Sequence, residues 1–229
     1  MLMKEERLLA VESLAFVNSA NAAQAMIEVA SKDTDVAKTA KYWAQRQGTA
    51  EWAKFGIQEA LKQGGVYDPD KVVNTSVTVP DESKERKVNV ADVMKLTGDA
   101  ATGKATIMRC VMCHQVNGIG PDYGPALKGW GTAQAREAII KSIVEPSADI
   151  AHGFAGTEIV LTDGKVIHGL FNPGDPASIK STGGTTQLLP KKKIQKQSAM
   201  KRSLMLSADQ LGLSPQDVAD IAAYMQSWK

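Results

Sequence analysis

Cys110-Val111-Met112-Cys113-His114 contains both cysteines of this 229-residue chain. Two residues separate the thiols, and two cysteines so close together cannot build a disulfide framework. The pair therefore needs a local explanation. The spacing fits a redox-active dithiol, half of a metal site, or an anchor for a covalently attached cofactor.

The histidine directly after the second cysteine favours the attachment of haem. Two thiols at this spacing can add to the vinyl groups on one edge of a haem, and His114 can then turn under the ring and ligate the iron. A thioredoxin-like dithiol would need a βαβ context, whereas here a predicted helix precedes the pair and a glycine-rich loop follows it. A structural zinc site needs four ligands. The set available for zinc would be Cys110, Cys113, His152 and His168.

The sequence on both sides of the motif resembles the cytochrome c fold. Residues 98–104 resemble the N-terminal helix of bacterial cytochromes c, in which Gly103 would let the C-terminal helix approach closely. Residues 218–225 resemble that terminal helix, with Tyr224 in its aromatic position. Ile107 departs from the pattern, because an aromatic residue is more usual there.

Gly124-Pro125-Ala126-Leu127 resembles the loop that follows the haem motif in this family. The resemblance implies that the Pro125 carbonyl accepts a hydrogen bond from the second ring nitrogen of His114, which fixes the ring and raises its basicity as a ligand. It also implies that Leu127 packs on the haem face. Gly120-Pro121 is a rival for this role, but no leucine follows it at the matching position.

A closer resemblance covers residues 98–229. It is to the haem-binding domain at the C-terminus of large secreted proteins of planctomycetes and verrucomicrobia, which often carry a sugar-dehydrogenase-like propeller and HEAT-like repeats upstream. The matching segments are 145–154, 163–165 with Gly169, and 203–205. Two positions depart from the family pattern, Leu206 in place of a proline and Thr132 in place of an arginine, and both concern loop geometry more than haem binding.

The resemblance implies that Met205 is the sixth ligand of the iron, opposite His114. Met200 lies in the same segment before the last helix and is the alternative thioether. Met112 lies inside the attachment loop and cannot reach the opposite face, and Met225 is expected to pack in the core. The bis-histidine alternatives are His152 and His168. Ligation by histidine and methionine would raise the reduction potential relative to two histidines.

Hydrophobic periodicity predicts a mainly α chain in three parts: a helical module at 1–66, a linker at 67–90 and a domain at 91–229 with a β-rich insertion at about 156–190. The resemblance implies that the last part is a cytochrome c domain. The module is predicted to hold four helices in two hairpins, which resemble HEAT-type repeats. Because such repeats need about three copies for stability, their opening at Met1 indicates a chain cut from a longer one; an ordinary helical cap is the alternative.

Further elements follow from periodicity and turn residues. In the module, helices are expected at Glu6–Asn18, at Ala22–Ser31, from Asp35, and around Trp52–Leu61 after a break at Gly48 or Thr49. In the domain, they are expected at 91–109 with a pause at Gly98-Asp99, at 133–144, and from Pro215 to Trp228. A glycine-rich loop is expected at 117–131. Strands are expected at 157–161, 165–171, 177–181 and 185–189, the first two joined by a turn at Asp163-Gly164.

Composition narrows the function classes. With 27 basic and 25 acidic residues, the charge is nearly balanced and gives no reason to expect nucleic acid. No apolar run approaches the roughly 20 residues of a membrane span. The polar residues 1–7 do not resemble a signal peptide. Because haem c is attached outside the bacterial cytoplasm, we still expect a periplasmic or extracellular protein.

The sequence therefore predicts one-electron transfer through a single haem c, with no catalytic acid, base or nucleophile of its own. The expected donor is an upstream dehydrogenase domain of the same polypeptide or a redox partner protein. A haem-based sensor or haem enzyme with an open sixth position stays an alternative, as does an interaction scaffold with a structural haem. A basic segment, Lys191, Lys192, Lys193, Lys196, Lys201 and Arg202, could dock an acidic partner, neutralise haem propionates, or form an ordinary solvated loop.

Overall fold

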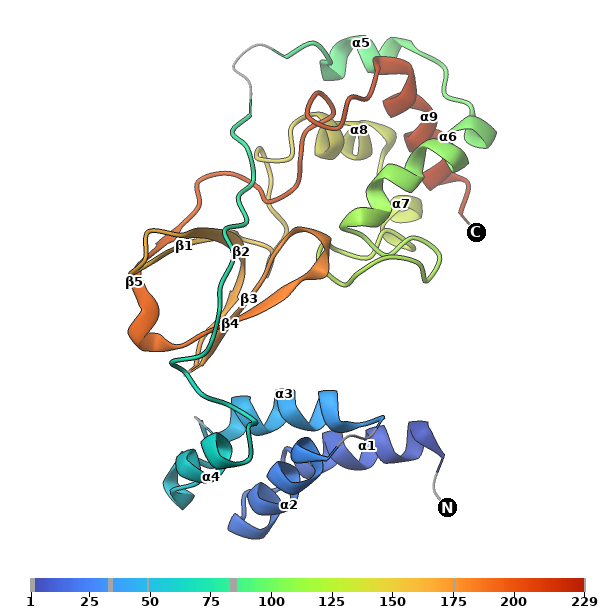
Figure 1. Ribbon diagram of the computed structural model, residues 1–229. Coiled ribbons are helices and arrows are strands. Elements are labelled where there is room, and N and C mark those ends of the chain that lie inside the picture. Colours follow the sequence, from blue (N-terminus) through green and yellow to red (C-terminus); the bar gives the residue numbers. More distant parts are fainter. Residues whose placement is uncertain (1–2, 33–34, 49, 83–85, 175, 229) are drawn as a thin grey trace. The chain divides into compact units, whose positions relative to one another are not determined.

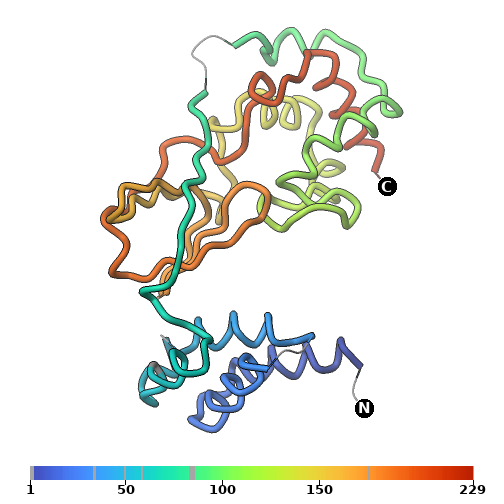
Figure 2. The backbone as a smooth tube through the Cα atoms, viewed as in Figure 1, coloured from blue at the N-terminus to red at the C-terminus, as the bar shows by residue number. Residues whose placement is uncertain are grey.

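A computed structural model describes residues 3–32, 35–48, 50–82, 86–174 and 176–228 (Figures 1 and 2). The chain forms two compact units. The first comprises residues 1–74, 172–178 and 187–194, and the second comprises 75–171, 179–186 and 195–229. Thr49, a predicted helix break, and residues 83–85 of the predicted linker lie outside the described residues.

The helices of the first unit are α1 (Lys4–Leu14), α2 (Ala20–Ser31), α3 (Ala37–Gly48), the 3₁₀ turn η1 (Ala53–Phe55) and α4 (Gln58–Gln63) (Figure 1). Ser19 caps α2, because its side-chain oxygen accepts a hydrogen bond from the Ala22 amide at 3.1 Å. Trp52 is buried in the core of the unit, and its indole N–H donates to the Val17 carbonyl at 3.1 Å. The fourth predicted helix is broken, because Gly56 adopts a left-handed conformation between η1 and α4.

The helices of the second unit are α5 (Val90–Lys95), α6 (Ala100–Thr106), the 3₁₀ turn η2 (Ile107–Met112), α7 (Trp130–Ala133), α8 (Arg136–Val144) and α9 (Pro215–Gln226). The expected close approach of α6 and α9 is present. A Cβ on Gly103 would lie 2.0 Å from the Asp220 carbonyl oxygen, and one on Gly98 would lie 2.1 Å from that of Ala219. The expected helix 133–144 is divided, because Gln134 and Ala135 adopt extended backbone between α7 and α8.

A five-stranded sheet contains β1 (Thr157–Leu161), β2 (Val166–Asn172), β3 (Ala177–Lys180), β4 (Thr186–Leu189) and β5 (Ile194–Ala199), in the order β4-β3-β2-β1-β5. The predicted hairpin joins β1 to β2, which pair antiparallel with Ile159 opposite Ile167. Gly164 supplies the left-handed residue of its turn. The edge strand β5 was not predicted and lies beyond the expected insertion at 156–190.

The segment expected as a linker is attached along much of its length. Within the second unit, Val77 forms a parallel bridge with Ile167 of β2. The guanidinium of Arg202 donates to the carbonyls of Val79 and Pro80. Figure 2 shows residues 75–82 as an extended trace. The residues therefore form part of the folded unit that contains the haem motif.

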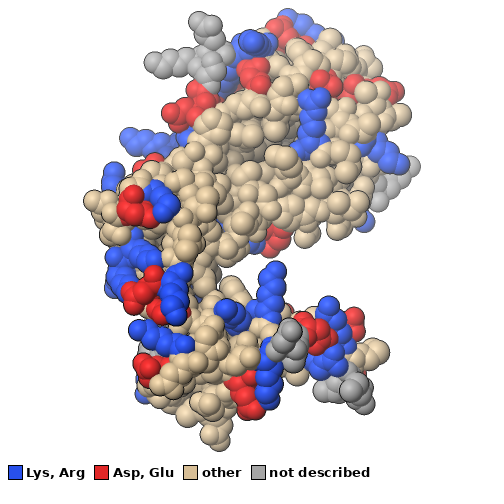
Figure 3. Space-filling view, in the orientation of Figure 1, with Lys and Arg blue, Asp and Glu red and all other residues tan. Residues whose placement is uncertain are grey.

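The basic segment is partly neutralised by the chain itself. In the first unit Lys192 pairs with Asp70, and Lys193 donates to the Val72 carbonyl. In the second unit Arg202 pairs with Asp81 at 3.1 Å. Basic and acidic side chains are interspersed on the face drawn in Figure 3. None of the helices described is long and apolar enough to cross a membrane.

Candidate functional site

The two cysteines lie at the end of η2, where the backbone turns tightly. The amides of Cys113 and His114 both donate to the Cys110 carbonyl, at 3.1 and 2.9 Å. The loop then folds back, because the Gly124 amide donates to the Cys113 carbonyl at 2.7 Å. This local network places His114 and the following loop beside both thiols.

His114 is held in one orientation by its own loop. Its Nδ1 lies 2.7 Å from the Pro125 carbonyl oxygen, which can only accept a hydrogen bond. The proton therefore sits on Nδ1, and Nε2 keeps a free lone pair for a ligand. Burial lowers the pKa of His114, partly opposed by the bond to Pro125, so the ring is neutral as a metal ligand requires. Gly124 packs against the ring, since a Cβ there would lie 2.6 Å from His114 Cε1.

All six residues predicted to hold the cofactor line one cavity of about 250 Å³ in the second unit. They are Cys110, Cys113, His114, Pro125, Leu127 and Met205. Most of the remaining wall is apolar and includes side chains that the sequence analysis did not assign to the site: Ile139, Ile143, Ile150, Phe154, Leu170, Leu204 and Ile221. These come from α8, the loop after it, β2, the segment before α9, and α9 itself, so their meeting depends on the tertiary fold.

The thiols do not resemble those of a redox-active dithiol. Burial raises the pKa of Cys110 to about 11, with a smaller contribution from Cys113. Burial also raises the pKa of Cys113. Reactive dithiols instead need a pKa below the usual thiol value, because the thiolate is the nucleophile. Both cysteines are free of disulfide bonds, as attachment to a cofactor requires.

The zinc alternative has no geometric support among the described residues. They contain no group of three or more histidine, cysteine or acidic side chains placed to hold a metal ion. His168 is buried in β2, where its Nδ1 accepts from the Val79 amide at 3.0 Å and its Nε2 lies 3.2 Å from Glu158 Oε2. Both ring nitrogens are therefore occupied, and His168 is unsuited to bind zinc or iron. His152 is exposed.

The candidates for the sixth ligand separate in space. Met205 lines the cavity, and its amide donates to Ser203 Oγ at 3.0 Å. Met200 lies against Gly156 and lines a second, more polar hollow with His168 and Glu158. Met112 is 56% exposed. Met225 of α9 also lines the cavity, where it is buried against Gly131.

Tyr123 is a site residue that the sequence analysis did not find. Its side chain is buried and lines the cavity, and its hydroxyl has no hydrogen-bond partner among the described residues. Burial raises the pKa of Tyr123. An unsatisfied buried hydroxyl fits a cofactor that brings polar groups into an otherwise apolar cavity. Its position directly before Gly124-Pro125 was the one available signal.

A comparison with known protein families finds a match for part of the chain. Residues 100–160 match the sequence model of the family described as Cytochrome c. This range contains the two cysteines, His114 and the Pro125 loop, and it ends before Met205. No curated protein matches the chain. The chain therefore contains a cytochrome c domain whose cofactor is covalently bound haem c with its iron, which points to haem-based electron transfer.

Proposed function

We propose that this protein carries one electron at a time through a single haem c ligated by His114 and Met205. The observation that carries the proposal is the cavity itself, which has His114, both cysteines and Met205 on its walls. The haem iron would supply the redox chemistry by cycling between its ferric and ferrous states. The protein's residues would anchor, orient and shield the haem.

Each residue has a defined part in this proposal. Cys110 and Cys113 provide the thiols for attachment, and Pro125 orients His114 so that Nε2 faces the iron. Leu127 covers the haem face with apolar surface. A thioether ligand opposite a histidine raises the reduction potential relative to bis-histidine ligation, which suits acceptance of electrons from a dehydrogenase.

The proposed setting is an electron relay outside the cytoplasm, in the periplasm or beyond the cell. We propose an upstream dehydrogenase domain of the same polypeptide, or a separate redox protein, as the electron donor. We also propose that the four helices of the first unit are HEAT-like repeats. Exposed Met108 and Met112 support electron exchange at the attachment edge, because they place that edge near the surface. No catalytic role of the protein's own residues is proposed.

The test is a visible absorption spectrum of protein matured with a haem-attachment system, recorded in both oxidation states for wild type and Met205→Ala. We expect a c-type reduced spectrum and the weak far-red band of ferric histidine–methionine haem. The band should vanish in Met205→Ala while covalent attachment is retained. Met200→Ala is the matched control and should keep the band.

Other spectra would change the proposal in specific ways. A five-coordinate wild-type iron would favour a sensor or haem enzyme with an open sixth position. A band that survives in Met205→Ala but is lost when Met225 is replaced would move the thioether ligand to α9. A bis-histidine spectrum would contradict methionine ligation altogether.

A further inference from the structure

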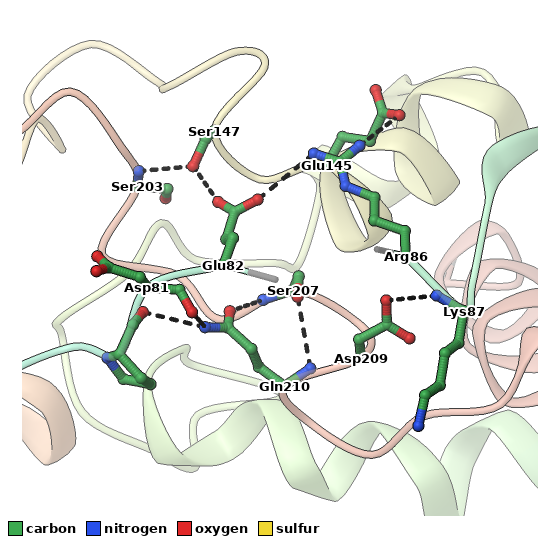
Figure 4. A network of polar contacts seen from close by, with 11 residues as sticks. Asp81, Glu82, Arg86, Lys87, Glu145, Ser147, Ser203, Ser207, Asp209 and Gln210 are labelled. Atoms are coloured by element: carbon green, nitrogen blue, oxygen red, sulfur yellow. Dashed lines mark hydrogen bonds and ion pairs between the residues drawn. The ribbon is translucent and has the colours of Figure 1, made fainter. Parts of the chain in front are cut away.

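The loop that carries Met205 lies between β5 and α9 and has no helix or strand of its own from residue 200 to 213. Its last residues form backbone hydrogen bonds within the loop, whereas buried groups near Met205 need partners from other segments. Ser203 is 8% exposed, and its amide donates to Ser147 Oγ at 2.9 Å. Ser147 Oγ in turn donates to Glu82 Oε1 (Figure 4). Because Ser203 Oγ accepts from the Met205 amide, a continuous chain of hydrogen bonds links Glu82 to Met205.

Arg86 holds Glu82, at the other end of this chain of hydrogen bonds. Its guanidinium lies 2.7 Å from Glu145 Oε1 and 3.5 Å from Glu82 Oε2 (Figure 4). The side chain of Glu82 is only 19% exposed, so its carboxylate depends on these partners for compensation of its charge. Pro146, between Glu145 and Ser147, lines the haem cavity. The network therefore meets the cavity wall at two places, Pro146 and Met205.

The segment that contains Glu82 and Arg86 is attached to the Met205 loop at two further points. Near its start, the side-chain Nε2 of Gln210 donates to the carbonyls of Pro80 and Asp81 at 3.1 and 3.2 Å. Near its end, the Asp209 carboxylate accepts from the Lys87 amide at 3.0 Å (Figure 4) and from the Val88 amide at 3.2 Å. Residues 80–81 and 87–88 are thus bound to the loop on both sides of Glu82.

We infer that residues 80–82 and 86–88 form a strap that holds the Met205 loop against the haem cavity and controls how readily Met205 leaves the iron. This inference rests on the proposed ligation by Met205. Glu82 and Ser147 are positioning residues, because they act on Met205 through the backbone of Ser203. The strap lies outside the range matched by the cytochrome c family. It makes the segment that leads into the domain a part of the haem site.

The test is the affinity of the ferric holoprotein for added imidazole, which competes with Met205 for the iron. Ser147→Ala removes the hydroxyl that joins Ser203 to the strap, and Glu82→Ala removes the carboxylate. Loss of a hydrogen bond to a charged group should favour the open loop enough to tighten apparent imidazole binding about tenfold in each variant. The double variant should bind little tighter than either single variant, because both changes break the same chain.

Two matched controls remove similar groups elsewhere. Ser227→Ala removes an exposed hydroxyl at the C-terminal end of α9 that donates to the nearby Tyr224 carbonyl, and Glu137→Ala removes an exposed carboxylate on α8. Both should bind imidazole like wild type. If Glu82→Ala does not accumulate, Glu82→Gln keeps its shape without the charge and should also tighten binding.

The outcomes separate the strap from the proposed ligation. Strap variants that bind imidazole like their controls, in a protein whose far-red band requires Met205, would overturn the strap and leave the ligation standing. A wild type that binds imidazole as tightly as Met205→Ala, with no far-red band, would overturn the ligation and with it the strap. Tighter binding in both strap variants and in neither control supports the inference.

Discussion

The two sides of the haem cavity are built from different kinds of chain contact. On the His114 side, the thiols, the histidine and its Pro125 partner all come from one continuous stretch, Cys110 to Leu127. On the Met205 side, the hydrogen bonds that tie the loop to the rest of the unit join distant segments. Ser147 and Ser203 are 56 residues apart, and Glu82 and Ser147 are 65 apart.

This difference predicts different stabilities for the two sides. A short loop closes at a small entropic cost, so the His114 side needs little beyond its own sequence. The Met205 side needs three remote segments to be folded at once, so the local opening of any one of them would release the loop. We therefore expect the Met205 side to release first under denaturant while His114 stays ligated.

The largest expected effect comes from a substitution that destabilises both sides of the cavity together. In Gly103→Ala, the new Cβ would lie 2.0 Å from the backbone oxygen of Asp220, so α6 and α9 must separate. We expect a loss of about 3 kcal/mol in the free energy of unfolding. Urea unfolding of the holoprotein, followed by Soret and far-red absorption, should show both signals lost at one lower midpoint.

Lys104→Ala on the exposed face of α6 is the control and should change the unfolding free energy by no more than about 0.5 kcal/mol. If Gly103→Ala unfolds like this control, the close crossing of α6 and α9 does not limit stability. If only the far-red signal moves, the two sides do not share this helix pair as a common support.

A smaller effect is expected from a change confined to the His114 side. The Cβ introduced by Gly124→Ala would lie 2.6 Å from Cε1 of His114 and 2.7 Å from Nδ1. The ring must rotate away from Pro125, at a cost of about 2 kcal/mol. Electron paramagnetic resonance of the ferric protein should show altered g-values. Ala126→Ser, at an exposed neighbouring position, should leave the spectrum as in wild type; identical spectra for both variants would contradict the proposed contact.

The same contrast explains what the sequence could predict. The Cys110–His114 motif carries its chemistry in residue spacing, and the family resemblance supplied the role of Pro125, so most of the His114 side was predictable. The β1–β2 hairpin was predictable from Asp163-Gly164, where glycine permits the left-handed turn. The family resemblance supplied Met205, which does line the cavity.

The rest depends on tertiary contacts that leave no local signal. The edge strand β5 has the sequence Ile-Gln-Lys-Gln-Ser-Ala, and its mostly exposed residues show no apolar alternation. Glu82, Ser147 and Ser203 are ordinary polar residues in unrelated segments until the fold brings them together. Tyr123 was missed for the same reason, because its hydroxyl becomes an unsatisfied buried group only inside the assembled cavity.

A change on the Met205 side should have a smaller and more local effect than Gly124→Ala. Asp209→Ala removes the acceptor of the Lys87 and Val88 amides. We expect a loss of about 1.5 kcal/mol in the free energy of unfolding and faster hydrogen exchange at these two amides. The g-values of the ferric protein, which report on the His114 ring, should not change. Asp209→Asn keeps one acceptor oxygen and should give an intermediate exchange rate. Equal exchange in wild type and Asp209→Ala would contradict this attachment of the strap.

The smallest expected effect concerns the start of α9, which supports both sides through Ile221 and Met225. Asp217 Oδ2 accepts hydrogen bonds from Ser214 Oγ and from the Ser214 amide, at 2.7 and 2.8 Å, and these lower the pKa of Asp217. A carboxyl group whose folded pKa lies below its unfolded value stabilises the fold above the unfolded pKa of about 3.9. That stabilisation is lost as the pH falls through the folded pKa.

Asp217→Asn should therefore cost about 0.5 kcal/mol near neutral pH, a small value because the group is screened by solvent. The difference between wild type and Asp217→Asn should disappear well below pH 4, where both side chains are uncharged. Urea unfolding across this pH range measures it, with the Soret and far-red midpoints shifting equally because α9 serves both sides. A difference that persists unchanged at low pH would assign the effect to the geometry of the amide and not to the charge of Asp217.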